Sequence, residues 1–529
     1  MKHVLTLRQF TCAAFALATL VSANQSDVSA QAMHPSTFPR VGTVDERFQS
    51  YNIEMVEVTG GRFWKPYASK ADSTPAQQSG NQPAGLNPAL FQYRPPIDLT
   101  NTRLCKLAAA LGPAYLRVSG TWANTVYFQN SDDPAPGTPP KGFNAVLTLK
   151  EWKGVVEFSR AVNAGLVTSF AISSGTRDAT GTWTPDQARQ LLNATHADGG
   201  SIAAVEFFNE PNMALIGGAP KGYDAAAYAR DITSFRAFLK KVSPDTILLG
   251  PGSVGEGTQS IPSGMGMLSS TDLLTATGPQ FDAFSYHSYG AVSSRCAAMS
   301  PRGGTTADAA LSEEWLARSG QIEDYYGGLR DRYLSGKPIW LTETAQAACG
   351  GDPWASTFLD SFRYLNQLGL LARRGVQVQM HNTLAASDYG LLDEKTYEPR
   401  PNYWAALLWR RFMGRTVLDP GSSSAPDLHL YAHCLADGKG GVSLLVINAS
   451  RDQAQTIEVA APSARYTLSA KNLEDKSVEL NGVELVLSEG DMLPELKGTA
   501  TRPGPVTLAP ASITFFALEK AGNPACRNN

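Results

Sequence analysis

The chain has 529 residues, of which 43% are hydrophobic and 18% are charged, a composition typical of a globular protein with more than one domain. Its formal net charge of −3 gives no basic surface for nucleic acid, so nucleic acid is not an expected partner. No hydrophobic run is long enough to cross a bilayer, so we expect no membrane association once the leader is removed.

The first residues predict a secretory signal peptide. The start, MKHVLTLRQ, is basic, an apolar stretch follows from Phe10 to Val21, and small-residue sites end at Ala23 or Ala32. We therefore expect residues 1–32 to be removed and the mature protein to be secreted or periplasmic.

From residue 50 onward, short apolar runs alternate with longer segments of helical pattern, such as DAAAYARDITSFRAFLKKV at 224–242. Eight of these runs predict strands: 51–58, 114–120, 166–173, 203–210, 246–252, 281–289, 338–343 and 376–382. Eight strand–helix units favour an α/β fold, a (β/α)8 TIM barrel spanning 50–413, over an open sheet.

Several of the predicted strands end in polar residues. Because barrel enzymes build their sites at the carboxyl ends of the strands, these side chains are expected to converge there: Arg117, Ser119, Glu210, His287, Tyr289, Glu343 and Asn382.

After Met413 the pattern changes to strands without intervening helices. Period-two alternation and turn residues predict a β-sandwich over 414–529, to which residues 39–49 add a strand. Its predicted strands are 427–436, 441–450, 456–462, 465–470 and 512–520. Two stretches rich in Pro, Ser and Gly, 67–88 and 131–140, predict surface loops on the barrel.

Two glutamates carry the functional prediction. Glu210 ends the fourth predicted strand, in FFNEPN, and Glu343 ends the seventh, in IWLTET. Facing each other across a barrel mouth, two carboxyl groups about 5–5.5 Å apart can cleave a glycosidic bond: one protonates the leaving oxygen and the other attacks the anomeric carbon. Each signal alone is modest, because a strand-end glutamate is often a salt-bridged structural residue and Asn-Glu-Pro can begin a helix. Together they predict a catalytic pair.

The neighbours of the two glutamates suggest their roles. Asn209 can reach the sugar 2-hydroxyl, so Glu210 is assigned as the acid/base, with its pKa raised by the charge of Glu343 and helped by partial burial. Glu343 must stay ionised to attack, which Arg117 and the Tyr289 hydroxyl would favour. The structural alternatives are a rim ion pair for Arg117 and packing under a loop for Tyr289.

Glu206 lies four residues before Glu210 on the same predicted strand. Alternation points it to the same side, about 13 Å deeper at roughly 3.3 Å per residue. We expect a buried structural residue, with Arg117 as its candidate partner.

The ordered motifs resemble the heparanase and β-glucuronidase family, glycoside hydrolase family 79, over nearly all of the mature chain. They are YNIEMVEV, AYLRVSGT, FFNEPN, SYHSY, LTETAQAACGG and ASDYGLLDEKTYEPRPNYWAALLW. The resemblance implies a retaining hydrolase of β-linked glucuronic acid that needs no cofactor. It also implies that backbone N–H groups of Gly350 and Gly351 and the Tyr389 hydroxyl hold the sugar carboxylate. Glu54, Thr121 and Asn209 match residues that bind the sugar hydroxyls, with His287 and Tyr289 beside the site.

The chain departs from animal heparanases in three respects. Cys349 stands directly before the glycine pair, and RVSG replaces a double glycine on the second strand. The long excisable linker of animal heparanase is lacking, so we expect a bacterial-type enzyme that is active as one polypeptide.

Beyond Cys12 in the leader, the cysteines are odd in number, so the sequence alone does not settle their pairing. No CxxC pair occurs and His is scarce, so no metal site is expected. Our working assignment pairs Cys434 with Cys526, a disulfide that the resemblance also implies, and Cys296 with Cys349, which leaves Cys105 reduced and buried.

Three functions remain open. The favoured one is an exo-β-glucuronidase that acts on glucuronides or glucuronic-acid-containing glycans. The loops at 67–88 and 291–312 are long enough to wall off the cleft, and the chain lacks a basic stripe for sulfated polymers. An endo-acting, heparanase-like enzyme for heparan sulfate is the alternative. An inactive sugar-binding module is disfavoured because both glutamates are present.

Overall fold

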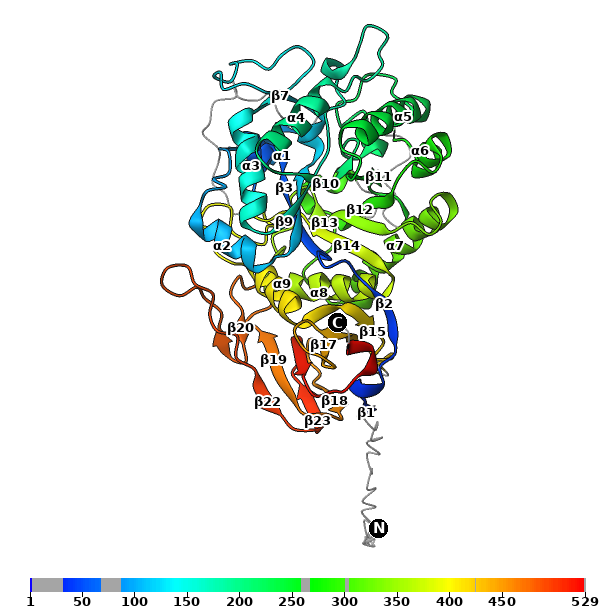
Figure 1. Ribbon diagram of the computed structural model, residues 1–529. Coiled ribbons are helices and arrows are strands. Elements are labelled where there is room, and N and C mark those ends of the chain that lie inside the picture. The colour runs from blue at the N-terminus through cyan, green and yellow to red at the C-terminus, as the bar shows by residue number, and fades with distance from the viewer. Residues whose placement is uncertain (2–31, 68–86, 258–266, 300–303, 424, 528–529) are drawn as a thin grey trace.

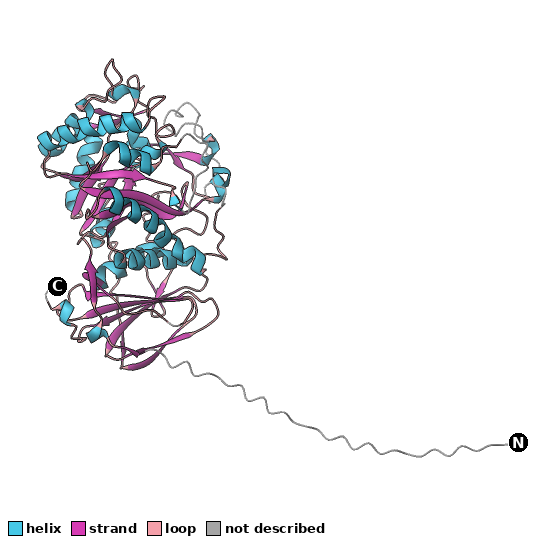
Figure 2. Ribbon diagram, turned by 90° about the vertical axis from the view of Figure 1, so that its right-hand side faces the viewer, coloured by secondary structure: helices cyan, strands magenta, loops and turns pink. Residues whose placement is uncertain are grey.

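The computed structural model describes residues 1, 32–67, 87–257, 267–299, 304–423 and 425–527. Nearly all of the predicted signal peptide and most of the 67–88 loop lie outside these residues. A helix-covered barrel forms the upper part of the molecule in Figure 1, and a sheet-rich C-terminal region forms the lower part. Figure 2 shows the two parts stacked on each other in a second view.

The barrel is closed and contains eight neighbouring parallel strands, which confirms the predicted TIM barrel. Every predicted run overlaps one of them. In order around the barrel they are β3 (Gln49–Glu54), β6 (Ala114–Ser119), β9 (Ala164–Thr168), β10 (Ile202–Glu206), β11 (Ile247–Ser253), β12 (Ala283–Val292), β13 (Ile339–Ala348) and β14 (Val376–His381).

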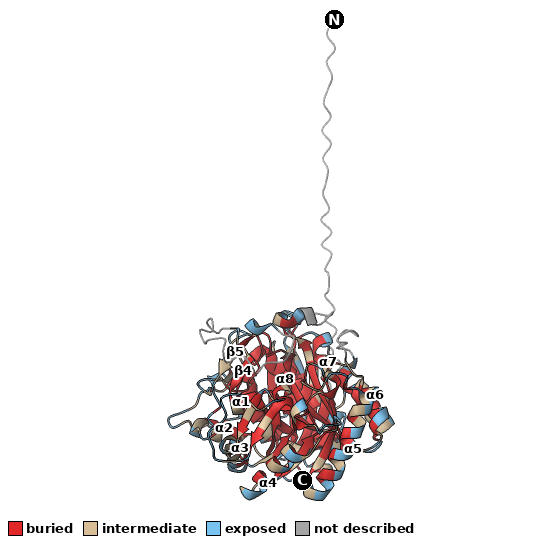
Figure 3. Ribbon diagram, turned by 90° about the horizontal axis from the view of Figure 1, so that it is seen from above, coloured by how far each residue is buried: buried red, intermediate tan, exposed pale blue. Residues whose placement is uncertain are grey.

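Helices cover the outside of the barrel, and the buried residues lie toward the middle of the molecule, with the exposed residues at its surface (Figure 3). In the described residues these helices are α1 (Met55–Thr59), α2 (Thr102–Ala110), α3 (Leu149–Ala161), α4 (Asp186–Ala197), α5 (Ala225–Val242), α6 (Ser270–Thr277), α7 (Glu313–Tyr333), α8 (Phe358–Arg373) and α9 (Pro401–Phe412). The predicted helix at 224–242 is α5, with Asp224 as its N-cap, whose side chain accepts a hydrogen bond from the Ala227 N–H. None of the described helices is long and apolar enough to cross a membrane.

The first predicted strand, 51–58, is wrong in its second half, where α1 begins instead. The Glu54 side chain accepts the Glu57 N–H, and the Glu57 side chain accepts the Glu54 N–H. This reciprocal capping box starts a helix immediately after β3. Two strand pairs were not predicted: β4 (Gly61–Trp64) with β5 (Phe91–Arg94), and β7 (Val126–Gln129) with β8 (Ala145–Thr148).

The C-terminal region contains two sheets. The nine-stranded sheet has the order β2 (Arg40–Thr43), β15 (Met413–Leu418), β16 (Leu428–Leu435), β17 (Val442–Asn448), β24 (Ser512–Leu518), β19 (Ser463–Ser469), β20 (Glu479–Leu480) and β21 (Val483–Glu484), with β22 (Thr499–Thr501) beside β19. The other sheet joins β1 (Ala32–Met33), β18 (Gln455–Val459) and β23 (Gly504–Leu508).

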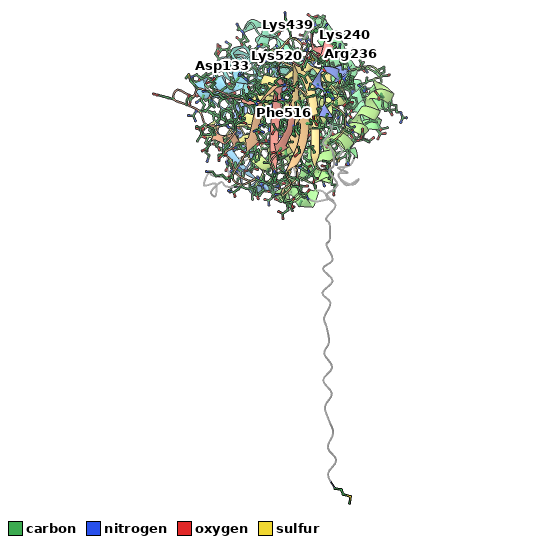
Figure 4. The ribbon with its side chains drawn as sticks, turned by 90° about the horizontal axis from the view of Figure 1, so that it is seen from below. Asp133, Arg236, Lys240, Lys439, Phe516 and Lys520 are labelled. Atoms are coloured by element: carbon green, nitrogen blue, oxygen red, sulfur yellow. A yellow bond between two sulfur atoms is a disulfide. The ribbon has the colours of Figure 1, made fainter. Side chains whose placement is uncertain are left out.

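Both sheets contribute to one apolar cluster, in which Leu444 and Phe516 meet Ile457 and Val506. Phe516, labelled in the view from below (Figure 4), is fully buried. Residues from the 39–49 range return to this region through β2, which pairs antiparallel with β15. The β-sandwich itself stays a prediction.

Helix α8 packs between the barrel and the nine-stranded sheet. The Tyr431 hydroxyl on β16 donates a 2.6 Å hydrogen bond to Oδ1 of Asn366 on α8. Gly369, one helical turn further along α8, faces the same ring, and a Cβ there would lie 2.2 Å from Cγ of Tyr431. Only glycine therefore permits this close approach.

The described residues contain two disulfides, Cys434–Cys526 and Cys296–Cys349, which are the expected pairs. Cys434–Cys526 ties β16 to the C-terminal residues of the described chain. Cys105 is free as expected, but it is half-buried rather than buried, because its position on α2 faces partly outward.

Candidate active site

A pocket of about 140 Å³ lies at the carboxyl ends of the barrel strands. Seven of its lining residues were expected at the site, namely Glu54, Thr121, Glu210, Tyr289, Glu343, Asn382 and Tyr389, and it is completed by Trp64, Trp122, Met213, Ile216, Val254, Val292, Ala348 and Cys349. A larger cavity, of about 360 Å³, lies near the amino ends of β3 and β6, beside Gln49 and Pro113. It contains none of the predicted catalytic residues, so chemistry rather than size identifies the smaller pocket as the site.

Glu210 does not continue β10 but follows a bend. The strand ends at Glu206, and Glu210 has a left-handed backbone, with φ of 51°, directly before the 3-10 helix Pro211–Met213. Such a conformation is costly for a residue other than glycine and occurs frequently at functional sites. Its side chain is 16% exposed and lines the pocket.

The prediction that Glu206 lies about 13 Å deeper than Glu210 assumed a straight strand and is wrong. The bend brings both carboxyl groups to one imidazole ring. Oε1 of Glu210 is 3.1 Å from Nδ1 of His287, and Oε1 of Glu206 is 3.7 Å from Nε2. Glu206 is nevertheless the expected buried partner of Arg117, whose Nε and Nη2 donate to its Oε2 at 3.1 and 2.9 Å.

Glu343, on β13, receives two hydrogen bonds. Nη1 of Arg117 donates to its Oε2 at 2.8 Å, and the Tyr289 hydroxyl donates to its Oε1 at 2.5 Å. These are the two groups expected to keep this carboxylate ionised. Arg117 is only 1% exposed, so its ion pairs lie beneath the pocket and not at the barrel rim.

Arg117 is the central cation of this network. Its Nη2 also donates to Oδ1 of Asn209 at 2.8 Å. Burial alone would lower the pKa of Arg117, but the charges of Glu206 and Glu343 raise it overall. The guanidinium therefore stays charged while it orients the carboxyl groups of Glu206 and Glu343 and the amide beside Glu210.

His287 was predicted only as a residue beside the substrate, but it lies between the carboxyl groups. Burial opposes a positive charge on the ring, and so does Nη2 of Arg117, which lies 3.2 Å from Nε2. The charge of Glu343, the nearby carboxyl group of Glu206 and the hydrogen bond to Glu210 outweigh both effects and raise the pKa of His287 to about 9. The raised pKa of His287 therefore follows from the three carboxyl groups that lie around its ring.

The pKa of Glu210 is raised, as an acid/base residue requires. The expected cause was mainly the charge of Glu343. Burial is instead the largest cause, and the charge of Glu343 adds to it, while the hydrogen bond from His287 works in the opposite direction. The order differs because the bend after β10 encloses Glu210 more than a strand-end position suggests.

Asn382, at the end of β14, holds the other predicted residues together. Its Nδ2 donates to Oε1 of Glu54 at 3.0 Å and lies 3.2 Å from the Tyr289 hydroxyl and 3.3 Å from the Tyr389 hydroxyl. Burial, and next the charge of Glu343, raise the pKa of Glu54 well above its usual range. Among the described residues, Oε2 of Glu54 is buried and has no hydrogen-bond partner.

Gly350 and Gly351 are buried and have left-handed backbones, with φ of 84° and 82°. They do not line the pocket, whereas the preceding Cys349 does. Their carbonyl groups accept hydrogen bonds from the hydroxyls of Ser387 and Ser293. Their role in binding a carboxylate therefore stays a prediction.

The apolar lining was missed by sequence reasoning. Trp64 reaches the pocket from the unpredicted β4, and its ring meets that of Trp122 edge-to-face at 6.4 Å. Met213 and Ile216 follow Glu210 closely in the chain, and that adjacency was the one available signal.

Glu210, His287 and Glu343 place one ligand atom each within 4.8 Å of one another, a spacing that could also hold a metal ion. These side chains already belong to the ion-pair network, because Arg117 donates a hydrogen bond to Glu343 and His287 is hydrogen-bonded to Glu210. A ring whose pKa is raised is a poor metal ligand, since coordination requires neutral imidazole. The donor set therefore suits acid–base chemistry better than metal binding.

No family model matches the chain. Heparanase-like protein 1 of Arabidopsis thaliana is 28% identical over 405 residues, which cover 72% of this chain and 70% of that protein. Baicalin-beta-D-glucuronidase of Scutellaria baicalensis is 26% identical over 471 residues, covering 80% and 84% respectively.

Among solved structures, the fold is similar to that of a 4-O-alpha-L-rhamnosyl-beta-D-glucuronidase from Fusarium oxysporum. The TM-score is 0.62 at 14% identity, over 92% of this chain and 100% of that one. At this identity the likeness shows the shared fold alone. The sequence relatives and the resemblance of the motifs agree, so the chain is a glycosidase that is similar to the heparanases and β-glucuronidases.

Proposed function

We propose that the chain is a retaining exo-β-glucuronidase, which removes terminal β-linked glucuronic acid from a glucuronide or glycan. The observation that carries the proposal is the approach of Glu210 and Glu343, whose nearest oxygens lie within 4.8 Å. Retaining glycosidases need about 5–5.5 Å between the carboxyl groups, whereas inverting ones need about 6.5–9.5 Å to admit a water.

In the first step, Oε1 or Oε2 of Glu343 attacks the anomeric carbon as Glu210 gives its proton to the leaving oxygen. The glycosidic bond breaks, and an ester forms between the sugar and Glu343. Glu210, now ionised, then takes a proton from water, which attacks the same carbon and releases Glu343. The raised pKa of Glu210 favours its protonated form, which supplies the proton. Arg117 and Tyr289 hold the nucleophile, Glu343, through hydrogen bonds.

The choice of glucuronic acid rests on the names of the relatives, of which one is a baicalin-β-D-glucuronidase. The Tyr389 hydroxyl lines the pocket and is a candidate donor to the sugar carboxylate. Backbone N–H groups of Gly350 and Gly351 are the further candidates, because glycine residues let backbone donors approach an anion closely.

Exo action is favoured by the contacts that hold the segment around Arg295 and Cys296 at the rim of the pocket. Arg295 lies 3.8 Å from the centre of the Tyr67 ring, and its Nη2 pairs with Oδ2 of Asp388 at 2.9 Å. The next residue, Cys296, is bonded to Cys349 in the pocket wall. An endo enzyme needs a cleft open on both sides, whereas this wall is tied to three segments. The described lining also contains no Lys or Arg for a sulfated polymer.

Export is also proposed, on the leader-like sequence at 1–32. The two disulfides support it, because disulfides persist mainly in oxidising compartments.

Release of p-nitrophenol from its β-D-glucuronide tests the sugar specificity, with the β-D-glucoside as the matched substrate. The proton NMR spectrum of the first product tests the mechanism, and the β anomer is expected. Oligosaccharides with terminal glucuronic acid should release only the monosaccharide. Early appearance of long oligomers would contradict exo action, and an initial α anomer would contradict retention.

A further inference from the structure

The pocket wall on the Glu210 side is apolar. Met213, Ile216 and Val254 line it, and Met213 packs against a cluster that includes Trp122 and Tyr289. Among the described lining residues none is Lys or Arg, so no cation there faces an anionic group of a bound molecule. Beyond the acid/base itself, this wall offers few polar side chains.

Buried hydrogen bonds hold the wall in place. Asn212 is fully buried, and its side-chain amide both donates to the Val254 carbonyl, at 2.7 Å, and accepts from the Val254 N–H, at 3.1 Å. The Met213 carbonyl accepts the Gly217 N–H at 2.9 Å, which closes the turn that carries Ile216. The wall is therefore preorganised, which lowers the entropic cost of binding an apolar group.

Glu210 determines which part of the substrate meets this wall. A general acid must lie within hydrogen-bond reach of the atom that it protonates, here the glycosidic oxygen. That oxygen carries the leaving group, so the leaving group lies next to Glu210. Met213 and Ile216 belong to the segment that begins directly after Glu210. With the sugar ring held between the two glutamates, the leaving group would therefore contact the apolar wall.

Resting on the glucuronidase activity proposed above, we propose that this subsite takes an alkyl or aromatic aglycone, so that the substrates are small-molecule glucuronides and not polysaccharides. Burial of one methylene group favours binding by about fourfold. A sugar placed against Met213, Ile216 and Val254 would lose water from its hydroxyls without gaining protein partners.

Methyl and hexyl β-D-glucuronide test the proposal, because their alcohols have similar acidity and differ mainly in apolar area. We expect kcat/KM for the hexyl compound to exceed that for the methyl compound by about tenfold or more, chiefly through KM. A glucuronosyl disaccharide should be slower than the hexyl compound. A hexyl-to-methyl ratio below about two, or a faster disaccharide, would overturn the proposal.

Ile216→Asn should reduce the hexyl-to-methyl ratio several-fold, and Met213→Gln, at a half-buried position, gives a second variant in case the first fails to fold. Val483→Asn is the control, since Val483 is 70% exposed on β21 of the C-terminal sheet and should leave the ratio unchanged. An unchanged ratio in both wall variants would contradict the role of the wall.

Failure of the proposed function gives a different result. If alkyl β-glucosides are cleaved and glucuronides are not, the sugar assignment is wrong, and the hexyl-to-methyl ratio measured on the glucosides still tests the wall. Calorimetry of both glucuronides with Glu343→Gln gives the same ratio without turnover. Equal affinities there would overturn the apolar subsite.

Discussion

The Tyr289 hydroxyl donates a 2.5 Å hydrogen bond to Oε1 of Glu343, from the neighbouring barrel strand. A short hydrogen bond to a carboxylate contributes about 1.5–3 kcal/mol. Tyr289→Phe should therefore lower kcat/KM by roughly 10- to 100-fold, because Glu343, the proposed nucleophile, loses its orientation, as steady-state kinetics would show.

Tyr286→Phe is the matched control. Tyr286 lies on the same strand and is fully buried, but among the described residues its hydroxyl has no hydrogen-bond partner. Removing that hydroxyl should leave activity unchanged and unfolding neutral or slightly more difficult. Equal losses of activity in the two variants would show that the Tyr289 effect comes from packing.

Glu210→Gln should slow substrates according to their leaving groups. An alkyl glucuronide needs its oxygen protonated, so kcat should fall by about 10²–10⁴. p-Nitrophenolate leaves with little help, so its first step should fall much less. A plot of log kcat/KM against leaving-group acidity should therefore be steeper for the variant than for the wild-type chain. Parallel plots would remove Glu210 from the acid role.

The barrel and the two glutamates could be predicted from the sequence because the information is local. Each strand is a short apolar run, and Glu210 and Glu343 end two of the predicted runs, although in the structure Glu210 lies four residues beyond β10 and Glu343 lies within β13. Once eight runs are counted, the closed barrel brings these ends together whatever the details of the loops.

The position of His287 and the order of causes at Glu210 could not be predicted in this way. Both depend on the bend after Glu206 and on the left-handed backbone of Glu210, which propensity disfavours. Trp64 enters the pocket from a hairpin whose partner, Phe91–Arg94, lies beyond a long intervening segment. Strand pairing across such a separation leaves no period in the sequence.

His287 should make stability fall at alkaline pH. Its pKa is raised to about 9 in the folded chain, from about 6.5 when unfolded, so the folded state binds the proton more tightly. This contribution is complete below about pH 6.5 and is lost as the pH rises through 9, and it is on the order of 3 kcal/mol. Urea unfolding of the wild-type chain and His287→Gln at pH 6, 7.5 and 9.5 should show their difference shrinking with pH.

His433 is an internal comparison, because its pKa is shifted in the opposite direction from that of His287. Burial lowers its pKa to about 4, so it destabilises the folded chain as the pH falls below about 6.5. His433→Gln should therefore change the acid side of the profile only. A His287→Gln profile parallel to the wild type between pH 6.5 and 9.5 would contradict the raised pKa of His287.

Removal of one disulfide should change substrate binding, whereas removal of the other should change stability. Cys296→Ser with Cys349→Ser frees the rim segment from the pocket wall, so KM should rise several-fold. The Cys434–Cys526 disulfide lies in the C-terminal region. Its removal by Cys434→Ser with Cys526→Ser should lower the unfolding free energy by about 2–4 kcal/mol without changing KM. Kinetics and urea unfolding of both double variants measure these effects. If the Cys296/Cys349 double variant and the wild-type chain had equal KM values, that disulfide would have no positioning role.

Gly120 should be indispensable because it faces Glu54. Its φ is 93°, and a Cβ there would lie 1.5 Å from Oε2 of Glu54, whose buried carboxyl group cannot move freely. Gly120→Ala should therefore lower the unfolding free energy by about 2 kcal/mol or more and displace Glu54 from the pocket, with loss of activity.

Gly328→Ala is the matched control. Gly328 lies inside α7 with nothing within 4 Å of the added methyl, so this substitution should stabilise the chain by about 0.5–1 kcal/mol. Thermal unfolding and kinetics of both variants measure this. An active, stable Gly120→Ala enzyme would mean that Glu54 is not held where the structure places it.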